Sequence, residues 1–254
     1  MELSFTDRVV LVTGASTGIG AAIARGFAAA GATVVVHYNS SADAAAAVVS
    51  DIAAAGGDAW AIRADVSVSE AVQELIDAVV ARHGRIDVLV NNAGGIVERS
   101  PIDEMSDELY GQVMDLNVRS VFQACRAVIP VMRSNGRGTI VNVASVAARN
   151  GGAGGAVLYA SAKSAVATLT RGLARELATD GIRVNALSPG LVDTPFHTRY
   201  TKPEVFSGLA ASIPLQRAAQ PEECVGPVLF LASELAASYV TGQILEVNGG
   251  QLMP

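Results

Sequence analysis

A strand followed by a glycine-rich loop and a helix, near the start of the chain, limits the possible folds most strongly. Residues 8–12 form a short run rich in β-branched side chains, which ends at the sequence Thr-Gly-Ala-Ser-Thr-Gly-Ile-Gly of residues 13–20. Ile23 and Phe27 then recur at helical spacing until Gly31, which predicts a helix that ends there. A strand, a glycine loop and a helix N-terminus together offer backbone N–H groups to a phosphate. The arrangement indicates a dinucleotide site, although three glycines can also mark an ordinary turn.

The three glycines of this loop have different predicted tasks. Gly14 permits the tight turn, Gly18 lets the backbone approach a pyrophosphate, and Gly20 lets the helix pack closely against the strand.

The turn after the second predicted strand, residues 33–37, bears on the choice of cofactor. Tyr38 stands where NAD-binding folds carry an acidic residue for the ribose 2′-hydroxyl. The polar groups of Asn39, Ser40 and Ser41 lie where the next helix begins and could hold a phosphate instead. No Arg or Lys stands near them in the sequence, so the preference stays open. We expect NADP to be preferred, with NAD as the alternative.

Predicted strands and helices alternate along the rest of the chain. Further strands are expected at residues 58–63, 88–90, 139–143, 183–187 and 243–247, and helices near 43–55, 72–84, 109–132, 159–179 and 222–231. This alternation predicts a single α/β domain over residues 1–254, with a Rossmann-type doubly wound parallel sheet of about seven strands and helices on both faces. Residues 191–214 mix proline and aromatic side chains without a clear period, which favours an irregular substrate lid, here called the lid segment.

Composition excludes several classes of function. The net charge of -6 gives no electrostatic footprint for nucleic acid or an anionic membrane. The only cysteines, Cys125 and Cys224, follow apolar runs and show neither disulfide nor metal spacing. Residues 1–5 do not resemble a signal peptide, and no apolar run is long enough to span a bilayer. We expect a cytoplasmic protein without a metal, acting on a small molecule.

Tyr159 and Lys163 are four positions apart and therefore share one face of the predicted helix. A phenol keeps its proton until about pH 10, and a neighbouring cation lowers that pKa toward the range useful for acid–base catalysis. The pair alone often arises by chance. Asn117, on an apolar helical face, is by itself more typical of a paired structural amide.

The three histidines are the other candidate acid–base groups. His83 precedes Gly84 at a helix end, where a cation is favourable, and His37 ends a strand on the cofactor side. His197, in the lid segment, is a candidate for substrate contact.

The whole chain resembles the short-chain dehydrogenase/reductase family, and its polar turn after the second strand is similar to those of 3-oxoacyl-acyl-carrier-protein reductases and bacterial sugar or polyol dehydrogenases. The motifs that carry the resemblance are Thr13-Gly14-x-x-x-Gly18-x-Gly20, Asp65, Asn91-Asn92-Ala93-Gly94, Asn117, Ser145, Tyr159-x-x-x-Lys163, Pro189-Gly190 and Thr194.

The resemblance implies a catalytic set of Asn117, Ser145, Tyr159 and Lys163. Tyr159 would be the general acid in carbonyl reduction and the base in alcohol oxidation. Lys163 would hold the nicotinamide ribose and depress the pKa of Tyr159. Ser145 would donate to the substrate oxygen, and Asn117 would hold a water that links Lys163 to solvent.

The resemblance also implies the cofactor contacts. Asp65 and Val66 would contact the adenine, residues 92–94 the adenosine ribose, and Val192 and Thr194 the nicotinamide carboxamide. The full predicted set is Gly14, Ser16, Thr17, Gly18, Ile19, Gly20, Tyr38, Asn39, Ser40, Asp65, Val66, Asn92, Ala93, Gly94, Tyr159, Lys163, Pro189, Gly190, Val192 and Thr194.

One spacing departs from the family pattern. Ser145 and Tyr159 are fourteen positions apart, where thirteen is common. The extra residue falls in the glycine-rich stretch 151–155, which a loop can absorb. We expect an altered shape beside the substrate and intact catalysis.

Three functions are compatible with these motifs. The first is an NADP(H)-dependent reductase most like a 3-oxoacyl-acyl-carrier-protein reductase. The second is a dehydrogenase of sugars, polyols or other secondary alcohols, slightly favoured because the lid segment has only Arg199 and Lys202 to attract an acidic carrier protein. The third is a non-catalytic dinucleotide sensor, which would be expected to have lost part of the catalytic set.

The family resemblance further implies a homotetramer built partly from the helices of Asn117 and Tyr159, with Val166 and Leu169 as apolar outer positions.

Overall fold

Seven parallel strands form one sheet whose spatial order differs from the chain order. The computed structural model describes residues 3–253. The strands lie in the order β3-β2-β1-β4-β5-β6-β7, and every neighbouring pair is parallel. The order reverses between β1 and β4, and such a switch point opens a crevice at the carboxyl ends of the strands. The strands are β1 (Val9–Val12), β2 (Thr33–Tyr38), β3 (Asp58–Arg63), β4 (Val88–Asn91), β5 (Gly138–Val143), β6 (Ile182–Pro189) and β7 (Ile244–Val247). The predicted α/β sheet is confirmed.

The central strands are apolar because helices cover both of their faces. Every residue of β1, β4 and β5 is buried. In the register of the sheet, Val10 pairs with Val34 on one side and with Val88 on the other. This continuous burial explains why the strands appear in the sequence as short β-branched runs.

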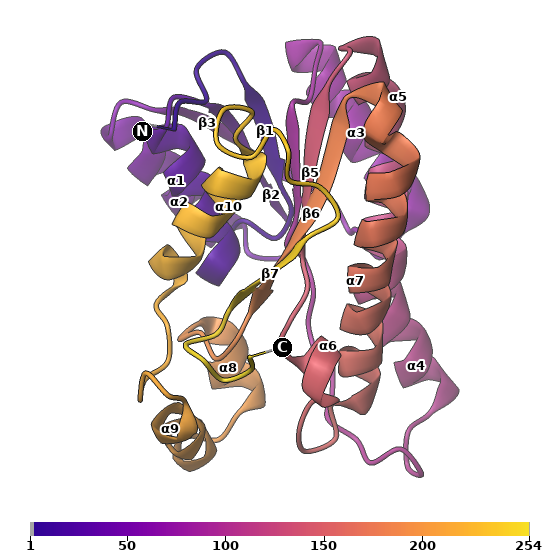
Figure 1. Cartoon of the computed structure of the whole chain (residues 1–254), viewed down its shortest axis with the longest axis vertical. Helices are drawn as coiled ribbons and strands as arrows, with labels where there is room; N and C mark the ends of the chain where they lie inside the picture. The colour runs from indigo at the N-terminus through magenta and orange to yellow at the C-terminus, as the bar shows by residue number, and fades with distance from the viewer. Residues whose placement is uncertain (1–2, 254) are drawn as a thin grey trace.

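Helices pack on both faces of the sheet (Figure 1). Ile23, Phe27 and Leu231 belong to the core under α1, α2 and α10, and Leu75 and Leu177 to the core under α3, α5 and α7. The α-helices are α1 (Gly18–Ala29), α2 (Ala42–Ala54), α3 (Ser69–His83), α4 (Asp107–Met114), α5 (Ser120–Ser134), α6 (Ala147–Asn150), α7 (Val157–Leu177), α8 (Pro195–Tyr200), α9 (Pro203–Ser212) and α10 (Val225–Ala232). Helices α6, α8 and α9 lie at the end of the molecule where the strands end (Figure 1).

The helix expected over residues 109–132 is interrupted by a π-helical turn, Asp115–Arg119, between α4 and α5. Asn117, in this turn, is fully buried, and its amide donates to the Val113 carbonyl oxygen at 2.9 Å. Turns of this kind are uncommon and often occur at functional sites. The sequence pattern did not reveal the turn because the apolar spacing is nearly helical on both sides of it.

The lid segment is more regular than its sequence indicates. It contains α8 and α9, and each has a proline in its first turn. The N–H groups of a first turn have no acceptor within the helix, so a proline there removes no helical hydrogen bond. The expectation of an irregular stretch was therefore wrong, because these helices are too short to show a period.

The outer positions expected on α7 were partly wrong. Val166 is fully buried, and Leu169 packs at the margin of the core under α7. The large apolar side chains exposed near them are instead Tyr110, Phe122 and Val157, on α4, α5 and α7. These helices thus keep an apolar outer surface, at other residues than the sequence indicated.

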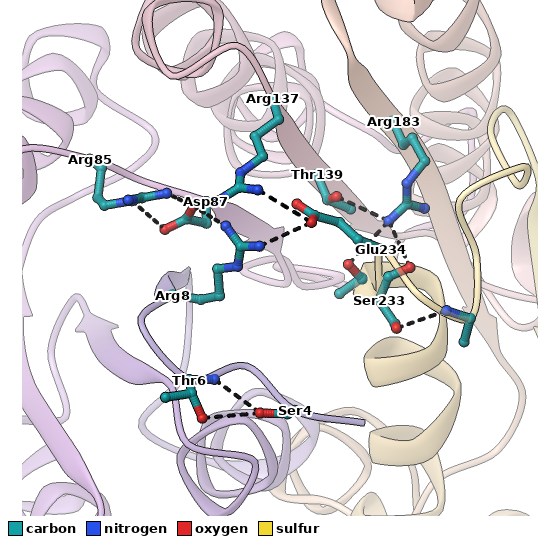
Figure 2. A network of polar contacts seen from close by, with 12 residues as sticks. Ser4, Thr6, Arg8, Arg85, Asp87, Arg137, Thr139, Arg183, Ser233 and Glu234 are labelled. Carbon is teal, nitrogen blue, oxygen red and sulfur yellow. Dashed lines mark hydrogen bonds and ion pairs between the residues drawn. The ribbon is translucent and has the colours of Figure 1, made fainter. Parts of the chain in front are cut away.

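An ion-pair network ties together the amino ends of the strands, at the opposite end of the sheet from the crevice (Figure 2). The buried Asp87 carboxylate accepts hydrogen bonds from the Val9 N–H and from the guanidinium groups of Arg8 and Arg85. Arg8 also donates to Glu234, just after α10, at 3.0 Å. The first strand, β4 and the C-terminal part of the chain are thereby joined around one carboxylate.

Removing this carboxylate should destabilise the fold. We expect Asp87→Ala to lower the free energy of unfolding by about 2–3 kcal/mol, because two guanidinium groups and a backbone N–H lose a buried acceptor while both arginines still reach water. Urea denaturation measures the change. The matched control is Asp51→Ala, whose pair with Arg25 is exposed on both sides and should contribute less than about 1 kcal/mol. Equal losses in the two variants would contradict the prediction.

Candidate active site

One cleft of about 460 Å³ lies at the carboxyl ends of the strands and gathers most of the predicted site residues. Its size is that of a small-molecule site. The predicted residues that line it are Gly14, Ser16, Thr17, Gly18, Ile19, Gly20, Asn39, Ser40, Asn92, Ala93, Gly94, Ser145, Tyr159, Lys163, Pro189, Gly190, Val192 and Thr194.

Four predicted residues do not line this cleft: Tyr38, Asp65, Val66 and Asn117. Tyr38 packs against the core under α1 and α2, and Val66 is buried in the core of the other face. The Asp65 carboxylate accepts hydrogen bonds from the Ser67 hydroxyl and N–H, and these bonds hold its pKa below the usual range. The structure therefore does not bring the two expected adenine contacts to the cleft wall.

The glycine loop has the geometry that its residues predict. Gly14 and Gly18 have φ angles of 63° and 54°, in the left-handed region that favours glycine. A Cβ atom at Gly20 would overlap the Gly14 carbonyl oxygen and the Asn92 amide, so only glycine allows α1 to start this close to the loop. A Cβ at Gly18 would lie 3.3 Å from the Thr194 side chain, so the glycine loop and the segment that carries Thr194 approach each other closely at this point.

His37 holds the glycine loop from below. Its Nδ1 accepts a hydrogen bond from the Gly14 N–H at 3.0 Å, and its Nε2 lies 3.1 Å from the Ala64 carbonyl oxygen. The ring is buried, and burial lowers its pKa. Both contacts are satisfied by the neutral ring with its proton on Nε2, which makes His37 a scaffold residue as its position at the strand end suggested.

Asn92 fastens the turn after β4 to the same loop. Its side-chain amide donates to the carbonyl oxygens of Thr13 and Gly14, at 2.9 and 3.0 Å. The Thr13 hydroxyl in turn accepts from the N–H groups of Asn92 and Ala93, both at 3.0 Å. The glycine loop and the Asn-Ala-Gly turn therefore form one rigid wall of the cleft.

Asn117 supports that wall from behind. Its Oδ1 accepts from the Gly95 N–H at 3.0 Å, and its amide donates to the Gly95 carbonyl oxygen at 2.8 Å. A Cβ at Gly94 would lie 2.8 Å from Asn117 Oδ1 and 3.1 Å from Lys163 Nζ, so these polar atoms flank the same backbone position. The paired structural amide expected from the sequence is present, and it lies beside the lysine.

Tyr159 and Lys163 share one face of α7, as their spacing predicts. Lys163 Nζ is buried, donates to the Val143 carbonyl oxygen at 2.7 Å and lies 5.8 Å from the centre of the Tyr159 ring. Burial lowers the pKa of Lys163 to about 8. Burial also raises the pKa of Tyr159 to about 12, although a hydrogen bond with Ser145 opposes the rise. Burial is therefore the largest influence on the pKa of Tyr159 in this structure, and it acts in the opposite direction to the depression expected from Lys163.

The lid segment adds an aromatic wall. The Phe196 ring lies 5.9 Å from the Tyr159 ring and 5.1 Å from the Tyr200 ring. His197 contacts Phe196 and Phe206, and burial, followed by the nearby Arg99 charge, lowers its pKa to about 4. A neutral His197 thus reaches the cleft, as its place in the sequence suggested.

Sequence reasoning missed several residues of the substrate side, including Arg99, Asn150, Phe196, Leu209 and Gln251. Arg99 follows the Asn-Asn-Ala-Gly turn, and its place after a strand end was a usable signal. Gln251 gave none, since only the folded chain brings it to the cleft.

Comparison with known proteins agrees with this geometry. The family model described as enoyl-(acyl carrier protein) reductase matches residues 14–251. A 3-oxoacyl-[acyl-carrier-protein] reductase from Synechocystis is 42% identical over 250 residues, which cover 98% of this chain and 99% of the relative. This chain belongs to the short-chain dehydrogenase/reductase family.

Solved structures of the family agree closely in shape. A 7α-hydroxysteroid dehydrogenase complexed with NADH and 7-oxo glycochenodeoxycholic acid superposes with a TM-score of 0.93 at 38% identity, over 98% of this chain and 96% of the other. A Beutenbergia cavernae protein with NADP bound at low occupancy, described provisionally as an NAD(P)-dependent gluconate 5-dehydrogenase, has a TM-score of 0.91 at 40% identity, over 99% of each chain. The protein is accordingly an oxidoreductase of alcohol and carbonyl groups that uses a nicotinamide dinucleotide.

None of the helices within residues 3–253 has the length and apolar character that crossing a membrane requires. The same residues contain no group of three or more His, Cys, Asp or Glu side chains placed to hold a metal ion.

Proposed function

We propose that this short-chain dehydrogenase/reductase uses NADPH to reduce 3-oxoacyl thioesters to 3-hydroxyacyl thioesters. The observation that carries the proposal is the cleft in which Ser145, Tyr159 and the buried Lys163 lie together beside the glycine loop. The 42% identical 3-oxoacyl-[acyl-carrier-protein] reductase, matched over nearly its whole length, supports this substrate class.

Tyr159 is assigned the proton transfer. Its raised pKa keeps the phenol protonated at neutral pH, so it can donate to the carbonyl oxygen of the substrate during reduction. Ser145 lines the same cleft as Tyr159, and its hydroxyl can bind that oxygen and stabilise its developing charge. The nicotinamide, when bound, supplies or accepts the hydride.

Lys163 is assigned the support of Tyr159 and of the nicotinamide ribose. Its ammonium group can stabilise the phenolate left after proton transfer. Asn117, which flanks Gly94 together with Lys163, would hold the water between the lysine and solvent.

The cleft fits a dinucleotide. The left-handed glycines and the overlap that any Gly20 side chain would cause leave a bare backbone cradle at the start of α1, which suits a pyrophosphate. Asp65 and Val66 follow β3 and lie outside the cleft. We therefore place them at the outer edge of the dinucleotide site, where they would contact the adenine.

A cation beside the turn after β2 supports NADP over NAD. Arg63 pairs with Tyr38 across β2 and β3 and donates from Nε to the Asn39 carbonyl oxygen at 3.1 Å. In the sequence no basic residue stands near Asn39. Arg63 lies in the next strand and comes close to Asn39 only through the pairing of β2 with β3. The Arg63 guanidinium and the polar groups of Ser40 and Ser41 would hold the 2′-phosphate.

The proposal is tested by following NADPH and NADH absorbance with acetoacetyl-coenzyme A. We expect faster loss with NADPH, and we expect Arg63→Gln to reduce the NADPH-to-NADH ratio of kcat/KM by about tenfold, the value of one charge-assisted contact. Arg25→Gln, which removes an exposed arginine from α1, should leave the ratio unchanged. An unaltered ratio in Arg63→Gln would contradict the phosphate assignment, and no turnover of the thioester would contradict the substrate.

A second candidate is a dehydrogenase of sugar-type or other secondary alcohols. It is favoured by the lid segment, where Arg199 and Lys202 are the only cations that could attract an acidic carrier protein. NAD(P)+ reduction on a panel of polyols and hydroxy acids, without turnover of the thioester, would select it. A non-catalytic sensor is disfavoured because all four catalytic candidates are kept, and any turnover excludes it.

The pH dependence of kcat/KM should reflect the protonation state of Lys163. With a pKa of about 8, Lys163 is mostly charged at pH 7, is half deprotonated at about pH 8 and loses its ammonium charge as the pH rises further. We therefore expect kcat/KM for NADPH to fall above about pH 8, by up to tenfold per pH unit. In Lys163→Arg the side chain stays charged, and the decline should move above pH 10. A wild-type profile that stays flat to pH 10 would contradict this role.

We also propose that the lid segment closes over bound substrate, that the enzyme is a homotetramer and that it works in the cytoplasm. Thr194, Phe196 and His197 line the cleft, which supports the lid.

Tyr110, Phe122 and Val157 are exposed on neighbouring helices, which supports association through α4, α5 and α7. Sedimentation showing only monomer would contradict the tetramer.

A further inference from the structure

Arg99 puts an uncompensated positive charge into the substrate side of the cleft. It lies in the loop between β4 and α4 and lines the cleft together with Phe196 and His197. Within residues 3–253, no Asp or Glu carboxylate lies within ion-pair distance of its guanidinium. The described residues that line the cleft include no acidic side chain at all, and the only other side chain among them that is mostly charged at pH 7 is Lys163.

The Arg99 guanidinium is held in place and only partly used. Its Nε donates to the Tyr200 carbonyl oxygen at 2.7 Å, and its Nη1 donates to the carbonyl oxygens of Ala153 and Gly154. In the described part of the chain, Nη2 has no hydrogen-bond acceptor. Two segments, α8 and the glycine-rich stretch 151–155, thus fix the orientation of the group, while one amino group stays available to a ligand.

The backbone that carries Arg99 is strained. Val97 has a φ angle of 67°, and the Glu98 N–H donates to the Ile96 carbonyl oxygen at 2.9 Å, which makes a γ-turn of the positive-φ kind. A β-branched residue rarely adopts this conformation, and such strain is kept where the surroundings impose it. The turn buries Ile96 at the cleft and directs the chain into Arg99.

The glycine-rich stretch 151–155 completes the frame. The Ser100 N–H donates to the Gly155 carbonyl oxygen at 3.1 Å, and a side chain at Gly155 would collide with the Ser100 backbone. Ala153 and Gly154 supply two of the Arg99 acceptors. The stretch that is one residue longer than the family pattern is therefore the one that holds Arg99.

The other polar side chains named on this side of the cleft, Asn150 and Gln251, carry no charge. Ile96, Ala156, Phe196 and Leu209 are apolar, and His197 is neutral at pH 7 because burial lowers its pKa to about 4. Arg99 is itself exposed to solvent, so its preference for anionic oxygen atoms comes from the fixed orientation of the guanidinium.

We propose that Arg99 is a specificity residue that binds an anionic group, a carboxylate or a phosphate, carried by the substrate away from its reacting carbonyl. The proposal rests on the reductase function above and narrows its substrates to anionic carbonyl compounds. Arg99 acts here by binding, and the proton transfer remains with Tyr159.

The test compares matched charged and neutral substrates. The carboxylate series is acetoacetate, 4-oxopentanoate and 5-oxohexanoate, each beside its methyl ester, so that the chain length measures the distance to Arg99. The phosphate pair is acetoacetyl-coenzyme A beside acetoacetyl-N-acetylcysteamine. Wild type should prefer at least one charged member by about 10- to 100-fold in kcat/KM, mainly through KM, as one charge-assisted contact allows.

Three variants separate recognition from a structural role. Arg99→Gln should abolish the preference, and Arg99→Lys should keep part of it. Arg199→Gln, which removes a cation of α8 that does not line the cleft, should leave the preference intact. A preference confined to the acids identifies a carboxylate ligand, and one confined to the thioester pair identifies a phosphate. Equal losses for charged and neutral substrates in Arg99→Gln, or no preference in wild type, would overturn the proposal.

If none of these compounds is reduced, the proposed function is contradicted, but the anion site at Arg99 can still be tested by measuring binding. The melting temperature is then measured with NADP+ and each acid or ester. Stabilisation by an acid in wild type, absent in Arg99→Gln, supports the anion site, and identical shifts in both proteins overturn it.

Discussion

Tyr159→Phe should lower kcat for carbonyl reduction by about 10³-fold or more, because the variant loses the proton donor of the reaction. The phenylalanine ring keeps the packing of Tyr159 against Phe196, so the fold and the cleft should remain. NADPH binding, followed by fluorescence, should change little, since the hydroxyl is needed for the chemistry more than for holding the cofactor. Single-turnover absorbance at saturating NADPH measures the chemical step directly.

The matched control for this variant is Tyr110→Phe, on the exposed face of α4. It removes the same hydroxyl group far from the cleft and should retain wild-type kcat. If Tyr159→Phe kept more than about a tenth of the wild-type rate, a group other than Tyr159 would have to supply the proton, and His197 could not do so at pH 7, because with a pKa of about 4 its ring is neutral.

Gly20→Ala should reduce NADPH affinity by about 100-fold or more. The added Cβ overlaps the Gly14 carbonyl oxygen and the Asn92 amide, and Asn92 fastens the glycine loop to the turn after β4. The loop has to move to accept the methyl group, and displacements of about 1 Å at such positions can cost two orders of magnitude. Overpacking should also destabilise the fold by about 1–3 kcal/mol. Isothermal titration with NADPH and urea denaturation measure the two effects.

Gly172→Ala is the control for this steric argument. Gly172 is exposed in the middle of α7, and nothing lies within 4 Å of the position its Cβ would take. The change should leave NADPH affinity intact and stabilise the helix by up to about 1 kcal/mol. If both glycine variants bound NADPH like the wild type, close contact at Gly20 would not be what shapes the cofactor loop.

Local sequence patterns predicted the sheet and most of the cleft. The strands and helices were found because buried parallel strands are β-branched runs and the helices between them have apolar stripes of helical period. The glycine loop and the spacing of Tyr159 and Lys163 were also visible, because φ angles and helix faces depend on residues close together in the chain. Both kinds of signal are short-range.

The π-helical turn at Asn117, the two helices of the lid segment and the pKa of Tyr159 could not be obtained in this way. The turn follows from hydrogen bonds between Asn117 and Gly95, which are far apart in the sequence. The pKa of Tyr159 is raised by burial in the folded cleft, whereas its spacing from Lys163 had suggested the opposite. Burial is a property of the packed chain, which the spacing of two residues does not reveal.

The sequence by itself thus determined the family, the parallel sheet and the residues at the reacting centre, since each depends on local backbone geometry or on one helical turn. Tertiary structure alone decided the charges around the ligand. Pairing of β2 with β3 brings Arg63 to Asn39, and the strained loop after β4 meets the glycine-rich stretch to hold Arg99 at the cleft. Charges act through space, and only the folded chain sets the distances between them.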